Sequence, residues 1–213
     1  MTGAAALVMA TATSALAFHG YSNAIEDNHA GHYTGLQMNR VDRAITQGTN
    51  GCSTFFSGYP TYQTQWLKVT STTNWMELGT GHQCGDTMRY WYWGYGFNGV
   101  WYPMGEALGV TAGVSHEFRI ARAGTDDWHF RVDGALKASL AWAVSGAADI
   151  VGLESYGPGT TTATYSSTSL KDTLDGGSWQ YWGGKNGSRV DTPEMCGGWN
   201  SATSWRASEN VAC

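Results

Sequence analysis

The sequence is poor in charged residues. Of its 213 residues only 14% are Asp, Glu, Lys or Arg, against roughly 25% in ordinary soluble domains. The net charge is −5, and the 12 Lys and Arg residues form no cluster. Nucleic acids and anionic membranes attract proteins through basic patches, so neither is an expected partner.

Long apolar runs are missing after the first residues. No segment beyond residue 17 approaches the ~18 apolar residues that a membrane span needs, so no span is expected. Residues 1–17 have a short apolar centre and end in Ala15-Leu16-Ala17, the small-x-small pattern that precedes signal-peptidase cleavage, although they lack a basic start. We therefore expect a signal-peptide-like segment at 1–17 and a secreted, extracellular protein. A buried Ala-rich helix is the alternative.

Cysteine is scarce, and its spacing does not suit a metal site. Cys52, Cys84, Cys196 and Cys213 form no CxxC and no zinc-like Cys/His pattern. In an exported chain four such residues are typical of two disulfides. Three pairings are possible; we favour Cys52 with Cys84 and Cys196 with Cys213, because the second bond would fasten the C-terminal tail.

Most motifs of cofactor and metal chemistry are absent. GxSxG and HExxH do not occur, and His29 and His32 are spaced i, i+3 in a segment without a helical pattern. Residues 94–99, "GYGFNG", match GxGxxG but lead into "VWYPMG" and not into a helix, so no helix N-terminus is present to bind a pyrophosphate. We expect no cofactor and no metal.

Glycine and aromatic residues are abundant, and the apolar pattern has a period of two. The chain has 29 Gly, 11 Trp and 11 Tyr. "EFRIAR" and "WHFRVDG" alternate, and Asp133-Gly134 predicts a hairpin turn before "ALKASLAW". Further predicted strands are "QWLKV", "NWMELGT", "TMRYWYW", "VWYPM", "DIVGLESY" and "TATYSSTSL".

This pattern predicts an all-β fold, an antiparallel two-sheet β-sandwich of jelly-roll, concanavalin-like type. We expect a single domain at 33–213, preceded by an irregular N-terminal arm at 18–32. The tail from about residue 183 is expected to be rich in loops and held by its disulfide. The protein is expected to be a monomer.

Two glutamates stand out against this background. Alternation places Met76 and Leu78 on one face of their strand and Glu77 on the other. The same rule separates Glu154 from its apolar neighbours in "DIVGLESY". Two carboxyl groups in contact share a proton, so that one can act as base on water while the other acts as acid. The alternative is that both are exposed residues of a solvated sheet face.

Aromatic residues favour a binding groove around these acids. The candidate groove residues are Trp66, Trp75, Trp91, Trp93 and Tyr156. A merely solvated face seldom needs so many aromatic side chains.

The order of these strands resembles the glutamic peptidases of the eqolisin type and the neprosin-like glutamic peptidases. The resemblance covers roughly residues 55–170 and runs through "WLKV", "WMELGTG", "RYWYWGYGFNGVWYP" and "VGLES". In those families the strands follow a fixed order: a Trp-rich strand, a strand with the first catalytic residue, an aromatic strand and a final strand with the catalytic Glu. The resemblance implies a β-sandwich and peptidase activity.

Carried over residue by residue, Glu154 matches the glutamate of the final strand. Eqolisins have Gln before Thr-Gly, and matching that pair to Thr80 and Gly81 puts Gly79 at the Gln position. Glu77, two residues earlier on the same face, would give a Glu/Glu pair closer to the neprosin arrangement. The expected ligand is a polypeptide or a polysaccharide. The first reading is an acid-active glutamic endopeptidase, the second a non-catalytic carbohydrate-binding or complex-forming sandwich, and the third a glycosidase.

Overall fold

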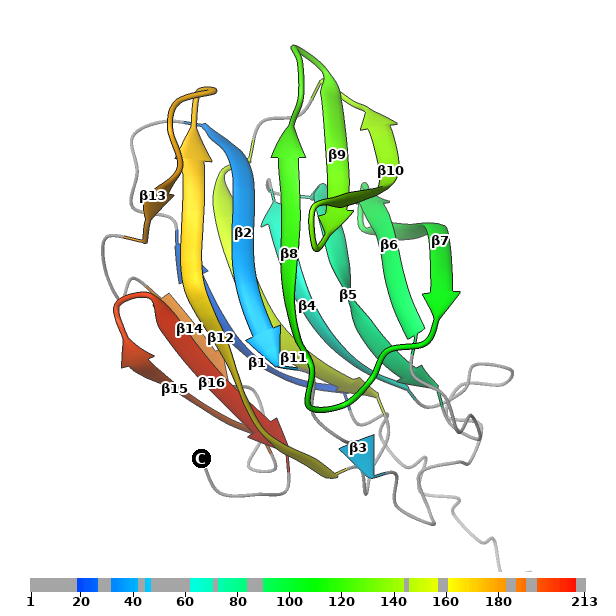
Figure 1. The fold of residues 1–213 in the computed structure, drawn as a ribbon, viewed down its shortest axis with the longest axis vertical. Helices are drawn as coiled ribbons and strands as arrows, with labels where there is room; N and C mark the ends of the chain where they lie inside the picture. Colours follow the sequence, from blue (N-terminus) through cyan, green and yellow to red (C-terminus); the bar gives the residue numbers. More distant parts are fainter. Residues whose placement is uncertain are drawn as a thin grey trace, which may run out of the picture.

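Alternation of apolar and polar residues builds the strands of this protein, and the strands form two antiparallel sheets (Figure 1). The structure is a computed structural model that describes residues 19–26, 32–41, 45–46, 62–70, 73–83, 90–143, 146–156, 161–182, 187–190 and 195–209. Within these ranges every regular element is a strand. The all-β, two-sheet sandwich of jelly-roll type predicted from the sequence is confirmed.

The first sheet has seven strands. Their order is β14 (Gly187–Val190), β1 (His19–Glu26), β11 (Ala148–Tyr156), β4 (Tyr62–Thr70), β5 (Trp75–Gln83), β6 (Tyr90–Phe97) and β7 (Val100–Leu108). This sheet contains both strands with the candidate glutamates.

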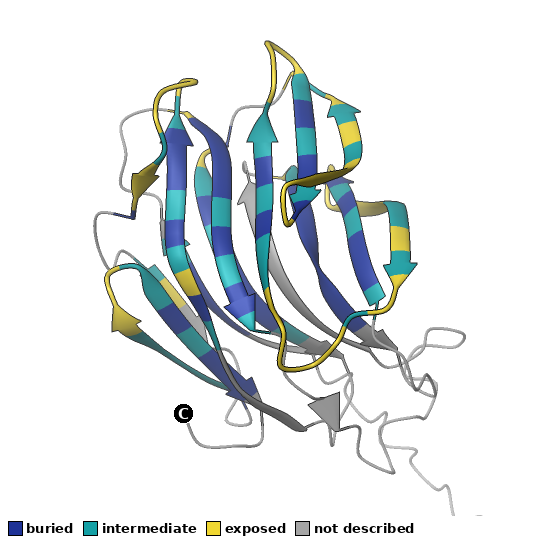
Figure 2. Cartoon of the chain, in the orientation of Figure 1, coloured by how far each residue is buried: buried dark blue, intermediate teal, exposed yellow. Residues whose placement is uncertain are grey.

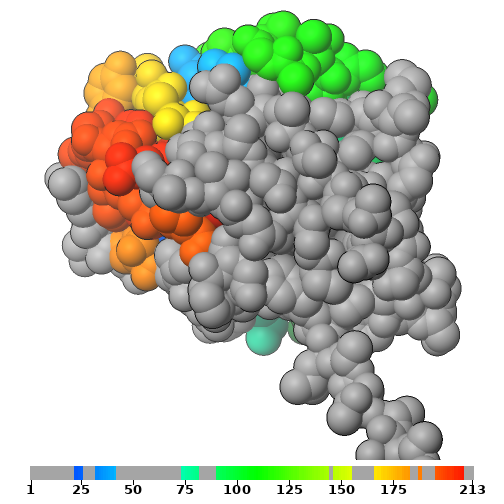
Figure 3. Space-filling model, turned by 90° about the horizontal axis from the view of Figure 1, so that it is seen from below, coloured from blue at the N-terminus to red at the C-terminus, as the bar shows by residue number. Residues whose placement is uncertain are grey.

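The second sheet has nine strands. Its main path is β10 (Ala135–Ala141), β9 (Asp127–Val132), β8 (Ser115–Arg122), β2 (Tyr33–Val41), β12 (Thr161–Leu174), β16 (Ser204–Glu209) and β15 (Met195–Ser201). The short strands β13 (Gln180–Tyr181) and β3 (Ile45–Thr46) pair with β12. Seen from below, the C-terminal strands, orange to red, gather beside β12, in yellow (Figure 3).

The core lies between the two sheets and is made by one face of each. Fully buried side chains include Leu36, Met38, Met76, Leu78, Phe118, Ile120, Trp128, Phe130, Val151 and Leu153. Buried positions alternate with partly exposed ones along β9, while exposed residues mark the edge strands β7 and β10 (Figure 2). The predicted inward faces of Met76 with Leu78 and of Val151 with Leu153 are therefore confirmed.

Several polar side chains are buried in the sandwich, and Arg40 is one that reaches from one sheet to the other. Arg40 of β2 is 1% exposed; its guanidinium stacks over the ring of Phe118 at 4.4 Å and donates from Nη2 to Thr80 Oγ1 at 2.9 Å. Thr80 belongs to β5, so this contact joins the nine-stranded sheet to the strand that contains Glu77.

Two hairpins have the turn residues that their geometry demands. Asp133 and Gly134 have φ values of 50° and 76°, and Asn98 and Gly99 have 50° and 79°. Two successive residues with positive φ form the type I′ turn that suits the twist of paired strands. The predicted Asp133-Gly134 hairpin is confirmed, and the end of "GYGFNG" is the turn between β6 and β7, not a phosphate loop.

The two ends of the chain are more regular than expected. Residues 19–26, expected to be part of an irregular arm, form β1, which pairs with β11 on one side and β14 on the other. The tail, expected to be loop-rich, contributes β14, β15 and β16. The signal-peptide-like segment at 1–17 lies outside the described residues.

Cys196 in β15 takes part in a disulfide. Cys52, Cys84 and Cys213 lie outside the described residues, so the pairing stays a prediction. Over the residues that the structure describes, no helix is long and apolar enough to cross a membrane.

Candidate functional site

Glu77 lies on the outer face of the seven-stranded sheet, near the start of β5. Its chain neighbours Met76 and Leu78 point into the core, so alternation directs Glu77 away from it. Glu77 is nevertheless only 6% exposed. A carboxyl group covered to this extent on a sheet face requires a polar partner.

Tyr92 of β6 supplies that partner. Its hydroxyl donates a hydrogen bond to Glu77 Oε1 at 2.5 Å. In the strand register Glu77 is opposite Gly94, and Tyr92 is opposite Gly79, so the hydrogen bond runs diagonally across the β5–β6 pair. Tyr92 is itself 8% exposed. Hydrogen bonds to carboxylates are among the stronger ones in proteins, and this one fixes the Glu77 carboxyl between the two strands.

Gly94 and Gly96 of β6 make room for two tryptophans from the neighbouring strands. A side-chain carbon at Gly94 would lie 2.6 Å from the indole of Trp101, and one at Gly96 would overlap the indole of Trp75. Trp75 and Trp101 are the register partners of Gly96 on its two sides. Both indoles therefore lie over the glycine backbone of β6.

The ring planes of these two indoles are nearly parallel. Their ring centroids are 6.5 Å apart and their planes differ by 14°. Tyr92 contacts Trp101 edge-on at 6.2 Å between centroids, which connects the pair to the Tyr92–Glu77 hydrogen bond. We call Trp75 and Trp101 together the indole platform.

Glu154 lies on the same outer face, on β11. It is opposite Thr64 of β4, which is opposite Gly81 of β5, and Gly81 is four residues from Glu77 along one strand. Two strand spacings and a rise of four residues put the Cα atoms of the two glutamates about 17 Å apart. The register therefore gives the two acids a shared face but no direct contact, unlike the proton-sharing pair expected from the sequence.

The expected aromatic groove residues divide between the two faces. Trp75 lies on the outer face. Trp91 and Trp93 point the other way: Trp91 is 8% exposed and packs on Phe118 of the opposite sheet at 5.5 Å between centroids, and Trp93 packs against the core. The expectation that Trp91 and Trp93 line the groove is therefore not met, because alternation in β6 turns Tyr92 outward instead.

The side chains of Trp66 and Tyr156 lie outside what the structure describes. The backbone of Trp66 is opposite Gly152 on one side and Gly79 on the other, in the row between Glu77 and Glu154. Its assignment to a binding face remains a prediction, as does that of Tyr156.

Sequence reasoning missed Tyr92 and Trp101. Both sets of alternating residues in "RYWYWGYG" are aromatic, so the pattern did not tell which set faces outward. The available signal was Gly94 and Gly96, which are in phase with Tyr92 and mark a face that other side chains cover closely.

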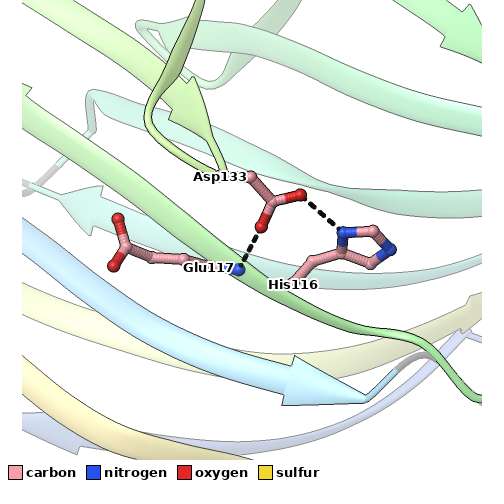
Figure 4. A network of polar contacts seen from close by, with 3 residues as sticks. All are labelled: His116, Glu117 and Asp133. Carbon is pink, nitrogen blue, oxygen red and sulfur yellow. Dashed lines mark hydrogen bonds and ion pairs between the residues drawn. The ribbon is translucent and has the colours of Figure 1, made fainter.

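A second polar cluster lies at the end of the nine-stranded sheet (Figure 4). Asp133 Oδ2 is 2.7 Å from His116 Nδ1, and Asp133 Oδ1 accepts a hydrogen bond from the Glu117 backbone N–H at 2.9 Å. Partial burial acts to raise the pKa of Asp133, but these bonds and the nearby His116 and Lys137 outweigh it and lower the pKa below 3.8. His116 also contacts Trp91 edge-on. The cluster fastens the turn between β9 and β10 to the start of β8.

Among the described residues, no group of three His, Cys, Asp or Glu side chains is arranged to hold a metal ion.

Comparison with known proteins finds similarity in structure alone. No protein-family model matches the sequence, and no curated protein matches it. Scytalido-glutamic peptidase bound to a peptide-based transition-state analog is similar over 91% of this chain and 99% of that chain, with a TM-score of 0.61 and 11% identity. SCP-B, a member of the Eqolisin family of peptidases in complex with the tripeptide Ala-Ile-His, is similar over the same shares, with a TM-score of 0.59 and 10% identity. The resemblance expected from the order of the strands is confirmed, and the chain has the fold of these glutamic peptidases.

Proposed function

We propose that this protein is a secreted, acid-active glutamic endopeptidase whose substrate lies across the outer face of the seven-stranded sheet. The observation that carries the proposal is the presence of Glu154 and the Tyr92–Glu77 pair on one face of a sandwich with the eqolisin fold. An extended polypeptide crossing that face would meet both acids.

Glu154 is the proposed catalytic residue. Its carboxylate accepts a proton from a water molecule as the water oxygen bonds to the scissile carbonyl carbon. The same carboxyl then returns the proton to the amide nitrogen as the C–N bond breaks, so that protons balance over the cycle. Such acid–base catalysis contributes roughly 10² to 10⁴ in rate. Carboxyl groups titrate in the acid range, which favours activity below neutral pH.

Glu77 has a different proposed role because of its distance from Glu154 along the sheet. The buried Glu77 carboxyl and the Tyr92 hydroxyl form a polar pair in an aromatic surrounding. We assign this pair to binding of the substrate main chain, where a carboxylate accepts from backbone N–H groups. This assignment separates substrate binding at Glu77 from proton transfer at Glu154.

The test is digestion of an acid-denatured protein at pH 3 to 4 by the wild type, Glu154→Gln and Glu77→Gln. Glu154→Gln should lower kcat by about 10²-fold or more, whereas Glu77→Gln should mainly raise KM. Glu117→Gln, on the opposite sheet, is the matched control and should match the wild type. Equal losses of kcat in both glutamate variants would contradict the separate roles of Glu77 and Glu154, and absence of cleavage by the wild type would refute the peptidase proposal.

A carbohydrate-binding sandwich without catalysis is the second candidate. The observation that favours it is the indole platform, since flat aromatic faces are suited to stacking on sugar rings. Glycan-array binding together with no proteolysis at any acid pH would support this candidate.

A further inference from the structure

We infer that the indole platform is a binding surface for a neutral polysaccharide, whether or not the neighbouring glutamates are catalytic. Trp75 and Trp101 have planes within 14° of each other and centroids 6.5 Å apart. Both lie over the glycine backbone of the same strand. Two parallel rings fixed over one strand offer two consecutive stacking positions, which a chain of linked sugar rings can occupy together.

The platform is held in place before any ligand arrives. The turn between β6 and β7 is tied to the residues that precede Trp75: the Gly99 N–H donates to the Thr73 carbonyl at 3.1 Å, and the Asn98 N–H donates to Asn74 Oδ1 at 3.0 Å. These bonds fix the start of β7, which contains Trp101, relative to the start of β5, which contains Trp75. Binding would therefore cost little ordering of the rings.

Trp101 leaves part of the platform open to solvent, since its side chain is 38% exposed. Its strand neighbours Val100 and Tyr102 alternate with it to the other face, where Tyr102 stacks on Tyr95. Two large indoles side by side, one of them this exposed, form an apolar patch of the kind typical of a binding surface.

The hairpin beneath the platform has no formal charge, since residues 90–105 contain no Asp, Glu, Lys, Arg or His. The acids beside it are the covered Glu77 and the exposed Glu106, which is opposite Tyr92 in the register. These acids disfavour an acidic ligand, and the uncharged hairpin favours a neutral one. A sugar ring presents a C–H face to the negative face of an indole, while its hydroxyl groups reach sideways to polar groups such as the exposed amide of Asn98.

The peptide alternative makes weaker use of this geometry. One aromatic side chain of a polypeptide would stack on a single indole and leave the second without a role. Two indoles with parallel faces are better explained by a ligand that repeats a flat ring. The ligand that fits this platform best is thus an uncharged polysaccharide with an extended chain.

The experiment measures depletion of the full chain from solution by microcrystalline cellulose and by chitin, and its retardation in native gels that contain mixed-linkage β-glucan. At least one of these probes should retain the wild type. Trp101→Ala should weaken that retention at least tenfold, and Trp101→Phe should weaken it less. Tyr181→Ala is the matched control, because Tyr181 is an aromatic residue on the other sheet that is 57% exposed. Circular dichroism and thermal unfolding of each variant separate lost binding from lost folding.

Glu154→Gln should be retained like the wild type, which distinguishes this inference from the proposed peptidase activity. Three results would overturn the inference: no retention by any of the three polysaccharides, equal retention of a folded Trp101→Ala variant, or selective capture of the wild type by immobilised aromatic peptides in place of polysaccharide.

Discussion

The outer faces of the two sheets are built from different side chains. On the seven-stranded sheet, β5, β6 and β7 present tryptophan and tyrosine over glycine, and the acid of β5, Glu77, is covered. On the nine-stranded sheet the outer face has ion pairs and polar contacts in solvent. His129 is 2.9 Å from Asp127 and 3.2 Å from Arg131, and Gln37 donates to Glu117 at 3.1 Å.

This difference indicates where function lies. Exposed ion pairs contribute little free energy because water and salt screen them. A covered carboxyl among aromatic rings is costly to bury and is retained where its chemistry is used. The aromatic face is therefore the one to which we assign the proposed function, and four predictions test the contrast.

The largest effect is expected at Arg40, which joins the two sheets through the core. Arg40→Ala removes the hydrogen bond to Thr80 and the packing on Phe118. We expect a loss of about 3 to 5 kcal/mol in the free energy of unfolding. Arg131→Ala, on the charged outer face, should cost less than about 1 kcal/mol. Urea unfolding of both variants measures the difference, and equal losses would refute the assignment of Arg40 to a structural role.

The second-largest loss of stability is expected at Gly96, on which the indole of Trp75 packs. In Gly96→Ala the new methyl group overlaps the indole of Trp75, so that ring must move. We expect a destabilisation of about 1 to 3 kcal/mol and a changed tryptophan fluorescence spectrum. Gly124→Ala is the matched control, because nothing lies within 4 Å of the added carbon there. A Gly96→Ala variant as stable as Gly124→Ala would contradict the close packing of Trp75 on β6.

Local patterns made some of this fold predictable from the sequence. Asp133-Gly134 specifies its turn through residues that tolerate positive φ, and the alternation around Met76 and Val151 specifies the inward faces of their strands. In each case the information lies within a few neighbouring residues.

Other features depend on partners distant in the sequence. β1 buries Ser22 and Ala24, small residues without a hydrophobic pattern, and is a strand because β11 and β14 pair with it. The separation of Glu77 from Glu154 is set by the register of β4 between their strands. Alternation predicts a shared face but not the positions along it, and for this reason the direct acid pair was expected and not found.

A smaller effect is expected when only the hydroxyl at the centre of the aromatic face is removed. Tyr92→Phe leaves the ring contacts and takes away the hydrogen bond to Glu77. Because Glu77 stays buried, we expect a loss of about 1 to 2 kcal/mol in unfolding free energy at neutral pH. Tyr95→Phe, on the inward face of the same strand, removes a hydroxyl that does not contact Glu77 and should cost less. If both variants unfold at the same urea concentration, the Tyr92–Glu77 hydrogen bond contributes nothing to stability.

The smallest effect is expected at the charged end of the other sheet and depends on pH. The pKa of Asp133 is lowered in the folded state, since its bonds to His116 and to the Glu117 N–H outweigh the opposing effect of burial. A lowered folded pKa means that the ionised group stabilises the protein above about pH 4 and that this contribution is lost as the pH falls through the folded pKa. Asp133→Asn keeps a residue suited to the type I′ turn and removes the charge. Because the Asp133 side chain is 53% exposed, screening should keep the difference from the wild type below about 1 kcal/mol. Urea unfolding between pH 2 and 6 should show this difference at pH 5 and its disappearance near pH 2, and in a His116→Ala background the difference should shrink. A difference that persists unchanged at pH 2 would show that the substitution acts through the turn and not through the charge.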